Sequence, residues 1–413
     1  MSGTVHVVGA GLAGLACAVA LASRGRNVAL HEATGQAGGR CRSLDDPTLG
    51  RRIDNGNHFL LAANRSALAY LATTGALPTL HDPGETVFPF VDVATGRRWC
   101  LRPNPGRLPW WLLAPRRRPP GSRARDWLEA RRLLRAGPDA TVAACLDPQG
   151  PLWRGFWEPL ATAVLNTAPE EASAHLLAAT WRETFLRGGA ACRPLLARTC
   201  LAATFVDPAL DFLARRGVGL RRHARLRAIR REGELVTALA FGSDSQPLAP
   251  RDRVVLAVPP HAARQLLPEI AAPEASRPIV NAHFRLPTAR STEPTLLGLV
   301  GGAAQWLVVR GDVVSITVSA ATGLVDEPAG RLAARLWADT ARALDLPESG
   351  LPPWRVVKER RATFAQTPAA ARQRPPTRTA VRNLFLAGDW TDTGLPATIE
   401  GAIRSGHAAA DAV

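Results

Sequence analysis

Four residues near the start of the chain have the types and the spacing that a dinucleotide site needs. Gly9, Gly11 and Gly14 form a GxGxxG pattern, and Glu32 follows them. In such a pattern the first glycine allows a tight turn, the second lets a pyrophosphate approach the backbone, and the third lets a helix pack closely on a strand. A carboxylate at the position of Glu32 accepts hydrogen bonds from a ribose hydroxyl. The pattern therefore predicts a site for the ADP half of a dinucleotide.

The elements that would position these residues are recognisable on both sides of the pattern. An apolar run at 5–8 predicts a strand, and the alanine- and leucine-rich stretch that ends at Ser23 predicts a helix. A second apolar run at 27–30 predicts another strand, which leads to Glu32. The helix would direct its unpaired N–H groups and the positive end of its dipole at the phosphates. This order of elements indicates a Rossmann-like unit.

A second glycine pair follows and narrows the choice of cofactor. Gly38-Gly39-Arg40 resembles the glycine-glycine-arginine extension of the FAD-dependent amine oxidase and carotenoid desaturase superfamily. The resemblance implies that Gly38 and Gly39 lie against the cofactor. It also implies that Arg40 is a planar, two-pronged donor to the pyrophosphate.

The far end of the chain carries a motif that implies the same cofactor. Gly388-Asp389 follows a short predicted strand at 383–386, and residues 395–406 predict a turn into a closing helix. This resembles the second FAD motif of that superfamily, in which the aspartate binds the ribitol or phosphate. The resemblance implies that Thr398 and Ile399, at the helix start, face the flavin pyrimidine edge. We expect FAD held non-covalently, because no cysteine lies in this motif.

The positions of the two motifs predict how the domains are arranged. We expect an α/β chain in which a Rossmann-like, GR2-type FAD-binding domain contains an inserted α+β substrate domain. The FAD-binding domain is expected at 1–85, 205–275 and 365–413, and the substrate domain at 86–204 and 276–364. With 413 residues, of which 46% are hydrophobic, the chain can bury a core of that size.

Further elements are predicted inside these domains. We expect a helix at 66–74, a hairpin of strands at 86–93 and 97–101, helices filling 123–185, and a helix at 207–216. Further strands are expected at 226–229, 235–241 and 253–258. Strands at 279–286, 306–309 and 313–319 should form the floor of the substrate cavity, covered by a helix at 329–344.

Three central segments sharpen the resemblance. The polar turn 54–58 (Asp54-Asn55-Gly56-Asn57-His58), the stretch 157–174 and residues 359–368 resemble the squalene-associated FAD-dependent desaturase family. Its members act as hydroxysqualene dehydroxylases in bacterial hopanoid synthesis. The family more often has Gln at the position of Asn57, one methylene longer.

The resemblance implies a specific reaction for this turn. Hydroxysqualene and reduced FAD would give squalene, water and oxidised FAD. Asn55 and Gly56 would then contact the cofactor, and a positioned acid would protonate the leaving hydroxyl. His58 is the candidate for the acid or polar anchor, with Asn57 beside it. The substrate would be a lipophilic isoprenoid.

Other functions stay open at this point. A carotenoid-type desaturase or a flavin amine oxidase would carry the same FAD motifs, although the single tyrosine, Tyr70, gives little material for an aromatic cage around an amine. A different class is a non-catalytic FAD-containing protein that binds membranes or nucleic acid.

The net charge of +16 is spread along the chain without a nucleic-acid-binding motif, so we expect no nucleic-acid partner. One local cluster is different. Trp110 and Trp111 precede Arg116, Arg117 and Arg118, a combination suited to an anionic membrane interface. We therefore expect a cytoplasmic protein with peripheral contact on the inner face of the cytoplasmic membrane. The sequence predicts no oligomeric state.

Several other sites are not expected. No uncharged stretch reads as a membrane span, because glycines interrupt both candidates. The six cysteines form no CxxC pair, and the nine histidines form no metal-binding pattern, so no metal site is predicted. Lys358, the only lysine, is expected to form a surface ion pair with Glu359.

Overall fold

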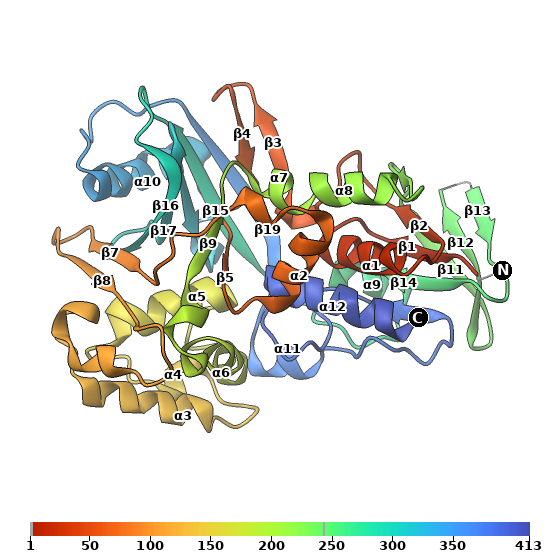
Figure 1. Cartoon of the computed structure of the whole chain (residues 1–413), viewed down its shortest axis with the longest axis horizontal. Helices are drawn as coiled ribbons and strands as arrows, with labels where there is room; N and C mark the ends of the chain where they lie inside the picture. Colours follow the sequence, from red (N-terminus) through yellow and green to blue (C-terminus); the bar gives the residue numbers. More distant parts are fainter. Residues whose placement is uncertain (1–2, 243) are drawn as a thin grey trace.

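Two sheets of different construction organise the molecule. The structure is a computed structural model that describes residues 3–242 and 244–413. A five-stranded parallel sheet lies in one half of the elongated molecule, and a seven-stranded mixed sheet lies in the other (Figure 1). This is the expected α/β class, with a parallel sheet for the nucleotide unit.

The parallel sheet has the strand order β10-β2-β1-β14-β20. Its strands are β10 (Leu220–Arg221), β2 (Val28–His31), β1 (Val5–Val8), β14 (Arg253–Leu256) and β20 (Leu384–Leu386). Four distant parts of the chain thus meet in one sheet: β14 lies directly beside the first strand, and β20 lies beside β14. The predicted strands at 5–8, 27–30, 253–258 and 383–386 are confirmed within two residues of the observed ends.

Helices cover this sheet and bring the chain ends together. Helix α1 (Leu12–Ser23) packs along α12 (Ile399–Ala412), and the contact is close because a Cβ at Gly406 would collide with the Ala13 carbonyl. Helices α2 (Arg65–Thr74) and α8 (Asp207–Ala214) complete the layer. The core between them is rich in alanine and leucine.

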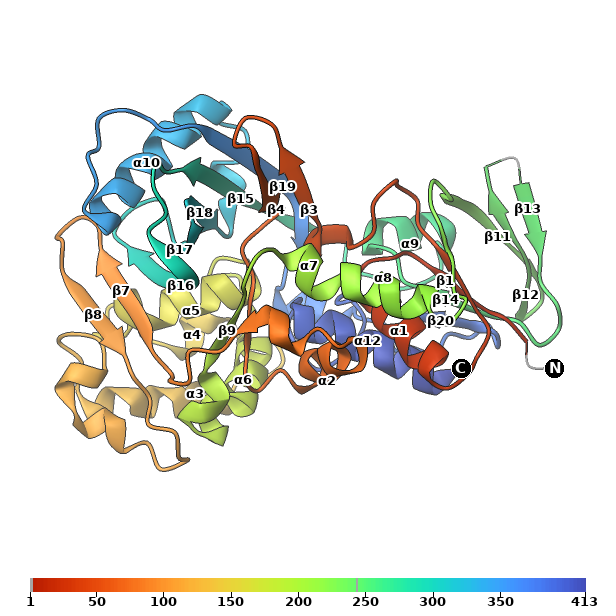
Figure 2. The same ribbon diagram turned by 45° about the horizontal axis from the view of Figure 1, so that its top comes forward.

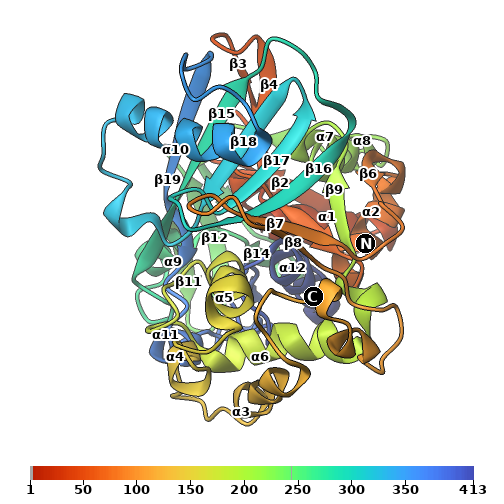
Figure 3. The same ribbon diagram turned by 90° about the vertical axis from the view of Figure 1, so that its left-hand side faces the viewer.

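The seven-stranded sheet has the order β19-β15-β18-β17-β16-β7-β8. Its strands are β19 (Trp354–Phe364), β15 (Ser276–Arg285), β18 (Val313–Val318), β17 (Trp306–Gly311), β16 (Ser291–Val300), β7 (Phe88–Asp92) and β8 (Arg98–Leu101). Helix α10 (Ala329–Leu344) packs on one face through Leu332, Leu336 and Trp337. A helical lobe covers the other face (Figure 3).

The helical lobe is built from short pieces around aromatic rings. Its helices are α3 (Ala130–Leu134), α4 (Val142–Cys145), α5 (Glu158–Leu165) and α6 (Ala174–Glu183). A π-helical turn at 153–157 precedes α5. Trp127, Phe156, Trp157 and Trp181 pack together with ring centroids 4.7–6.5 Å apart. The lobe lies at the opposite end of the long axis from the small sheet of β11 (Leu226–Glu232), β12 (Leu235–Phe241) and β13 (Asp244–Pro247) (Figure 2).

Three small sheets and three short helices fill the remaining positions. The sheets are β11-β12-β13 (Leu226–Glu232, Leu235–Phe241, Asp244–Pro247), β3-β4 (Ser43–Asp46, Arg51–Asp54) and β5-β9-β6 (Phe59–Leu61, Pro194–Ala197, Leu80–His81). The helices are α7 (Leu201–Phe205), α9 (Pro260–Leu266) and α11 (Pro368–Arg372). Strand β9 pairs with β5 and β6, so residues from both predicted domains share one small sheet.

The element predictions are mostly confirmed, with two corrections. The hairpin, the strands and the helix at 329–344 are present. The region 123–185 is not filled by regular helices, because prolines and glycines divide it into short turns. Strands β16 and β19 were not expected as strands, since their faces carry a mixture of polar and apolar residues. Helix α10 covers one face of the seven-stranded sheet, and that this sheet forms the floor of the substrate cavity stays a prediction.

Candidate active site

The glycine-rich loop joins β1 to α1 at the carboxyl edge of the parallel sheet. Gly9 has a φ of +109°, a conformation that other residues adopt only with strain. A Cβ at Gly14 would collide with the Gly9 carbonyl oxygen, so helix and loop pack without a gap. A Cβ at Gly11 would meet no atom within 4 Å. The loop therefore leaves free space only at its middle glycine, beside the start of α1.

Glu32 connects this loop to the end of β2. Its carboxylate accepts hydrogen bonds from the Ala10 backbone N–H at 3.0 Å and from the N–H and hydroxyl of Thr34 at 2.9 Å. A carboxylate has about four lone-pair positions, so one acceptor site remains open after these bonds. The side chain is thus held in place beside the loop with acceptor capacity to spare.

Arg40 joins the two predicted cofactor motifs. Its guanidinium donates to Asp389 Oδ1 at 2.7 Å and to the Ala362 carbonyl at 2.5 Å. The Asp389 carboxylate is the largest influence that raises the pKa of Arg40 against the opposing effect of burial. Gly38 and Gly39 adopt positive φ values of +101° and +56°. The Gly38 N–H donates to the Ala10 carbonyl, so the second glycine pair lies against the first glycine loop.

An arginine that sequence reasoning missed organises the C-terminal motif. Arg374 is 6% exposed and donates to the backbone carbonyls of Asp389, Thr391 and Leu395. Burial lowers its pKa, but nearby carboxylates oppose that shift. A single arginine between predicted elements gives no sequence signal, because its partners are carbonyl groups of a loop.

Helix α12 begins beside this loop. The Thr398 hydroxyl caps it by accepting from the Gly401 N–H at 3.1 Å, and Ile399 is the first helical residue. Glu400 points away from the loop and accepts from the N–H groups of Ser66 and Ala67 at the start of α2. The N-terminus of a fourteen-residue helix is thereby fixed next to Gly388 and Asp389.

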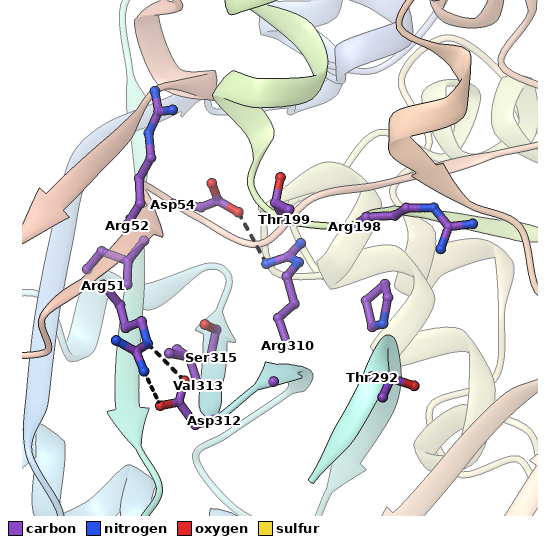
Figure 4. A pocket seen from close by; sticks show the side chains of 13 residues that line it. Arg51, Arg52, Asp54, Arg198, Thr199, Thr292, Arg310, Asp312, Val313 and Ser315 are labelled. Atoms are coloured by element: carbon purple, nitrogen blue, oxygen red, sulfur yellow. Dashed lines mark hydrogen bonds and ion pairs between the residues drawn. The ribbon is translucent and has the colours of Figure 1, made fainter. Parts of the chain in front are cut away.

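The polar turn 54–58 follows β4 and is anchored from its first residue. Asp54 is 3% exposed and accepts from Arg310 at 3.2 Å, from the Ser43 hydroxyl at 2.7 Å and from the Leu201 N–H at 2.8 Å. Burial raises the pKa of Asp54, and Arg310 opposes this shift. Asp54 and Arg310 both line a cavity of about 260 Å³, and Figure 4 shows Arg310 pointing at Asp54.

That cavity is lined by four arginines, each of which has an acidic partner. Arg51 pairs with Asp312, as the dashed lines in Figure 4 show. The other pairs are Arg52–Asp207, Arg198–Glu293 and Arg310–Asp54. The arrangement fixes the turn from outside and does not offer a strongly cationic site.

Asn55 and Gly56 are held by the neighbouring sheet. The Asn55 amide donates to Glu359 at 3.3 Å and to the Arg40 carbonyl at 3.4 Å. The Asn55 carbonyl accepts from Asn281 on β15 at 3.0 Å. Asn281 was not predicted as a site residue, and it also accepts from Thr317 at 2.7 Å. Two strands of the seven-stranded sheet thus position the turn.

Asn57 and His58 have a different environment from the rest of the turn. Neither the Oδ1 nor the Nδ2 atom of Asn57 has a hydrogen-bond partner, although both are buried. Burial, together with the positive charges of Arg40 and Arg310, lowers the pKa of His58 to about 4. The imidazole is therefore neutral at pH 7. An unpartnered buried amide costs about 1–3 kcal/mol unless a bound molecule satisfies it.

The predicted membrane-contact segment is only partly at the surface. Trp110 is 52% exposed, with Arg117 stacked 4.7 Å from its ring centre. The expectation for Trp111 is wrong: it is 4% exposed and packs on Trp127. A 3-10 helix at 110–113 turns adjacent residues to different sides, so only one tryptophan faces outward. Leu108 and Leu113 are 82% and 76% exposed.

The expected ion pair of Lys358 with Glu359 is absent. Adjacent residues of a strand point to opposite faces. On β19, Lys358 donates to the Glu327 carbonyl, and Glu359 lies near Asn55 and Arg42. Glu359 is thereby one of the groups around the cofactor motifs.

Two features are absent from the described part of the chain: a metal site and a membrane-spanning helix. No group of three or more His, Cys, Asp or Glu side chains in residues 3–242 and 244–413 could hold a metal ion. In the same residues no helix is long and apolar enough to cross a membrane. All six cysteines are free.

Comparisons with known proteins agree with the geometry. The model of the family described as flavin containing amine oxidoreductase matches residues 12–413. A hydroxysqualene dehydroxylase of Rhodopseudomonas palustris is 47% identical, over 100% of this chain and 99% of that protein. One of Sinorhizobium fredii is 44% identical, over 100% and 98%. The structure of cyclohexylamine oxidase from Brevibacterium oxydans has a TM-score of 0.67 at 17% identity, over 100% of this chain and 98% of that chain, and thus shares the fold.

Proposed function

Because the chain belongs to the hydroxysqualene dehydroxylases, within the flavin-containing amine oxidoreductases, we propose that it converts hydroxysqualene to squalene. It is an FAD-dependent oxidoreductase, and the dehydroxylase reading is supported over the desaturase and amine oxidase alternatives. The single observation that carries the proposal is full-length identity of 43–47% to three proteins of that name.

The residues of this chain fit FAD. The free space at Gly11, the start of α1 and the open acceptor position of Glu32 suit the ADP half. Arg40 and Asp389, which hold each other across the two motifs, suit the pyrophosphate and ribitol. Thr398 and Ile399 place the α12 N-terminus where a flavin pyrimidine edge would gain from a positive dipole. The remaining predicted contacts of this site are Gly9, Gly14, Gly38, Gly39, Asn55, Gly56 and Gly388.

The proposed reaction also requires that the site bind the hydroxyl oxygen of the substrate and that a proton reach it. When bound, reduced FAD supplies the hydride that replaces the hydroxyl group on carbon. The hydroxyl leaves as water, so a proton must reach its oxygen. A neutral His58 cannot deliver that proton as an imidazolium ion at pH 7. We assign His58 and the unpartnered Asn57 amide to holding the hydroxyl by hydrogen bonds.

The test is anaerobic single turnover. The bound flavin is reduced, hydroxysqualene in detergent is added, and the oxidised flavin band and extracted lipids are followed together. We expect reoxidation with one squalene formed per flavin. No reoxidation by hydroxysqualene, with bleaching of the oxidised enzyme by a polyene or an amine, would contradict the proposal.

The substrate barely dissolves in water, and the exposed apolar residues suggest where it enters. We propose that Leu108, Trp110 and Leu113 contact a bilayer that contains anionic lipid, on the cytoplasmic face of the membrane. Their side chains are 82%, 52% and 76% exposed, a large apolar area for a surface segment. Arg116 and Arg117 lie beside them and would favour anionic headgroups.

Vesicle binding tests this surface. Replacing all three with serine should strongly reduce co-sedimentation with vesicles of phosphatidylglycerol and phosphatidylcholine, with FAD retained. The matched control is Leu351→Ser, which changes a leucine that is 40% exposed in a different loop. Equal binding of both variants would refute the contact.

A further inference from the structure

One row of side chains crosses the seven-stranded sheet on the face that the helical lobe covers. Directly paired residues place Asn281 opposite Thr317, Thr317 opposite Trp306, and Trp306 opposite Gly298. Gly298 is opposite Phe90, and Phe90 is opposite Trp99. Residues paired in this way share one face of a sheet. Six strands, from β15 to the edge strand β8, thus contribute one residue each.

The row changes character along its length. At one end, Asn281 and Thr317 are buried, hydrogen-bonded to each other and attached to the polar turn through the Asn55 carbonyl. Beyond them, the Phe90 ring contacts both Trp306 and Trp99, with ring centroids 5.5 and 5.4 Å apart. The polar end therefore lies at the turn that carries Asn57 and His58, and the aromatic end leads away from it.

Gly298 makes the aromatic part continuous. Phe90 and Trp306 come from strands on either side of β16, and their rings meet over the position where residue 298 would carry a side chain. A Cβ there would collide with the Phe90 ring. A glycine in a strand interior weakens the strand, so this one is explained by the close approach of the two rings.

Several aromatic rings at this end of the row are only partly buried. Trp99, Trp306 and Phe59 remain partly accessible although they adjoin the buried cluster between sheet and lobe. Phe59 follows His58 directly in the sequence, and its ring centroid lies 5.9 Å from that of Trp306. The indole N–H groups of Trp99 and Trp306 are buried without a partner, which is unusual for tryptophan. The two indole rings therefore interact with their surroundings through their apolar faces and not through hydrogen bonds.

We propose that this row binds an apolar arm of a long-chain isoprenoid alcohol, with the hydroxyl at its polar end. The proposal rests on the function proposed above. From β18 to β8 the row spans four inter-strand spacings, roughly 19 Å at about 4.8 Å each, which accommodates several isoprene units. Trp306, Phe90 and Trp99 are then specificity residues that select a long apolar chain, and Gly298 keeps their surface unbroken.

The row points towards the proposed membrane contact. The edge strand β8 ends at Leu101, and the next N–H, of Arg102, donates to the Arg117 carbonyl. Arg117 in turn stacks on the exposed Trp110. An apolar arm that follows the row outwards would thus come towards the segment that meets the bilayer.

The test measures binding of squalene, so that it does not depend on turnover. Radiolabelled squalene is partitioned at equilibrium between detergent micelles and the oxidised holoenzyme. We expect Trp306→Leu to raise the dissociation constant for squalene about tenfold and to leave that for geraniol, which has only ten carbons, nearly unchanged. Gly298→Val should have a similar effect, because it separates the rings of Phe90 and Trp306.

Trp337→Leu is the matched control. Trp337 is buried, has an unpartnered indole N–H, and packs on Phe284 on the opposite face of the same sheet. It should lower the melting temperature without changing squalene affinity. If Trp306→Leu loses its FAD, Phe90→Leu and Gly298→Ala replace it.

The outcomes separate this proposal from the proposed function. Equal affinities of the Trp306 and Trp337 variants, in a protein that still forms squalene, would overturn the row and leave the function intact. A wild-type protein that neither binds squalene nor forms it would overturn both. A selective loss of affinity in the row variants supports the row.

Discussion

The cofactor end and the substrate end of this molecule are built in opposite ways. At the cofactor end, chemistry depends on residues close together in sequence, such as Gly9 to Gly14, and the contacts of Gly9 and Gly14 leave no room for one extra carbon. At the substrate end, the row from Asn281 to Trp99 takes one residue from each of six strands. The first region is specified locally and should fail abruptly. The second is specified by strand pairing, and each residue should contribute a limited share.

The largest effect is expected within the glycine loop. Gly14→Val forces a side chain into the Gly9 carbonyl, so we expect a loss of about 3 kcal/mol or more in the free energy of unfolding. Gly11→Ala places its Cβ where no protein atom lies within 4 Å, so it should leave the apoprotein melting temperature unchanged and weaken FAD binding. Thermal unfolding of the apoprotein and FAD titration measure the two quantities. Equal melting temperatures for both variants would remove the distinction between packing and cofactor space.

Acid should act on both ends at once, through one buried histidine in each. Burial lowers the pKa of His31, on β2, to about 4, and does the same for His283, on β15. Each of these histidines takes up a proton near pH 6.5 in the unfolded chain but only near pH 4 in the folded chain. The free energy of unfolding is therefore unaffected by them above pH 6.5 and decreases as the pH falls towards 4. At pH 5 each histidine should cost about 2 kcal/mol.

Urea unfolding at pH 7 and pH 5 measures this loss. His31→Phe should flatten the pH dependence in the cofactor half, because a phenyl ring can keep the stack between His6 and Phe241. His283→Gln should flatten it in the other half. A pH dependence identical to that of the wild type in both variants would show that other groups cause the acid sensitivity.

The ion pair that joins the two cofactor motifs should have an intermediate effect. Asp389→Asn removes the carboxylate partner of Arg40, whose side chain is 39% exposed and is therefore partly compensated by water. We expect FAD affinity to fall about tenfold, equivalent to about 1.4 kcal/mol. Asp411→Asn is the control, because its pair with Arg24 is exposed on both sides and should contribute nothing measurable. Flavin fluorescence titration compares the two variants.

The same contrast explains what the sequence could predict. The glycine loop, Glu32 and the Gly388-Asp389 motif are recognisable because the residues of each motif lie close together in the sequence as well as in the fold. Arg374, Asn281 and Glu359 were missed because their partners lie 15, 226 and 304 positions away in sequence and are carbonyl or amide groups that any polar residue could contact.

Trp111 was assigned to the wrong side for a related reason. Its neighbour Trp110 has the same chemistry, and only the 3-10 turn and the ring of Trp127 decide which one is buried. The row across the sheet needs the register of five strand pairs, and no local pattern contains that information.

The smallest effect is expected at the junction of the two regions. Thr317→Val keeps the shape of a buried side chain but removes the hydroxyl that donates to Asn281. The side-chain amide oxygen of Asn281, Oδ1, is then left without this partner. We expect a loss of about 1 kcal/mol in the free energy of unfolding. Thr340→Val, on α10, removes only a hydroxyl bonded to its own helix and should cost less. Because Asn281 holds the Asn55 carbonyl, Thr317→Val should also weaken FAD binding slightly, whereas Thr340→Val should not. If both variants lowered stability equally and left FAD affinity unchanged, the sheet would not position the cofactor turn, and the two ends of the molecule would be independent.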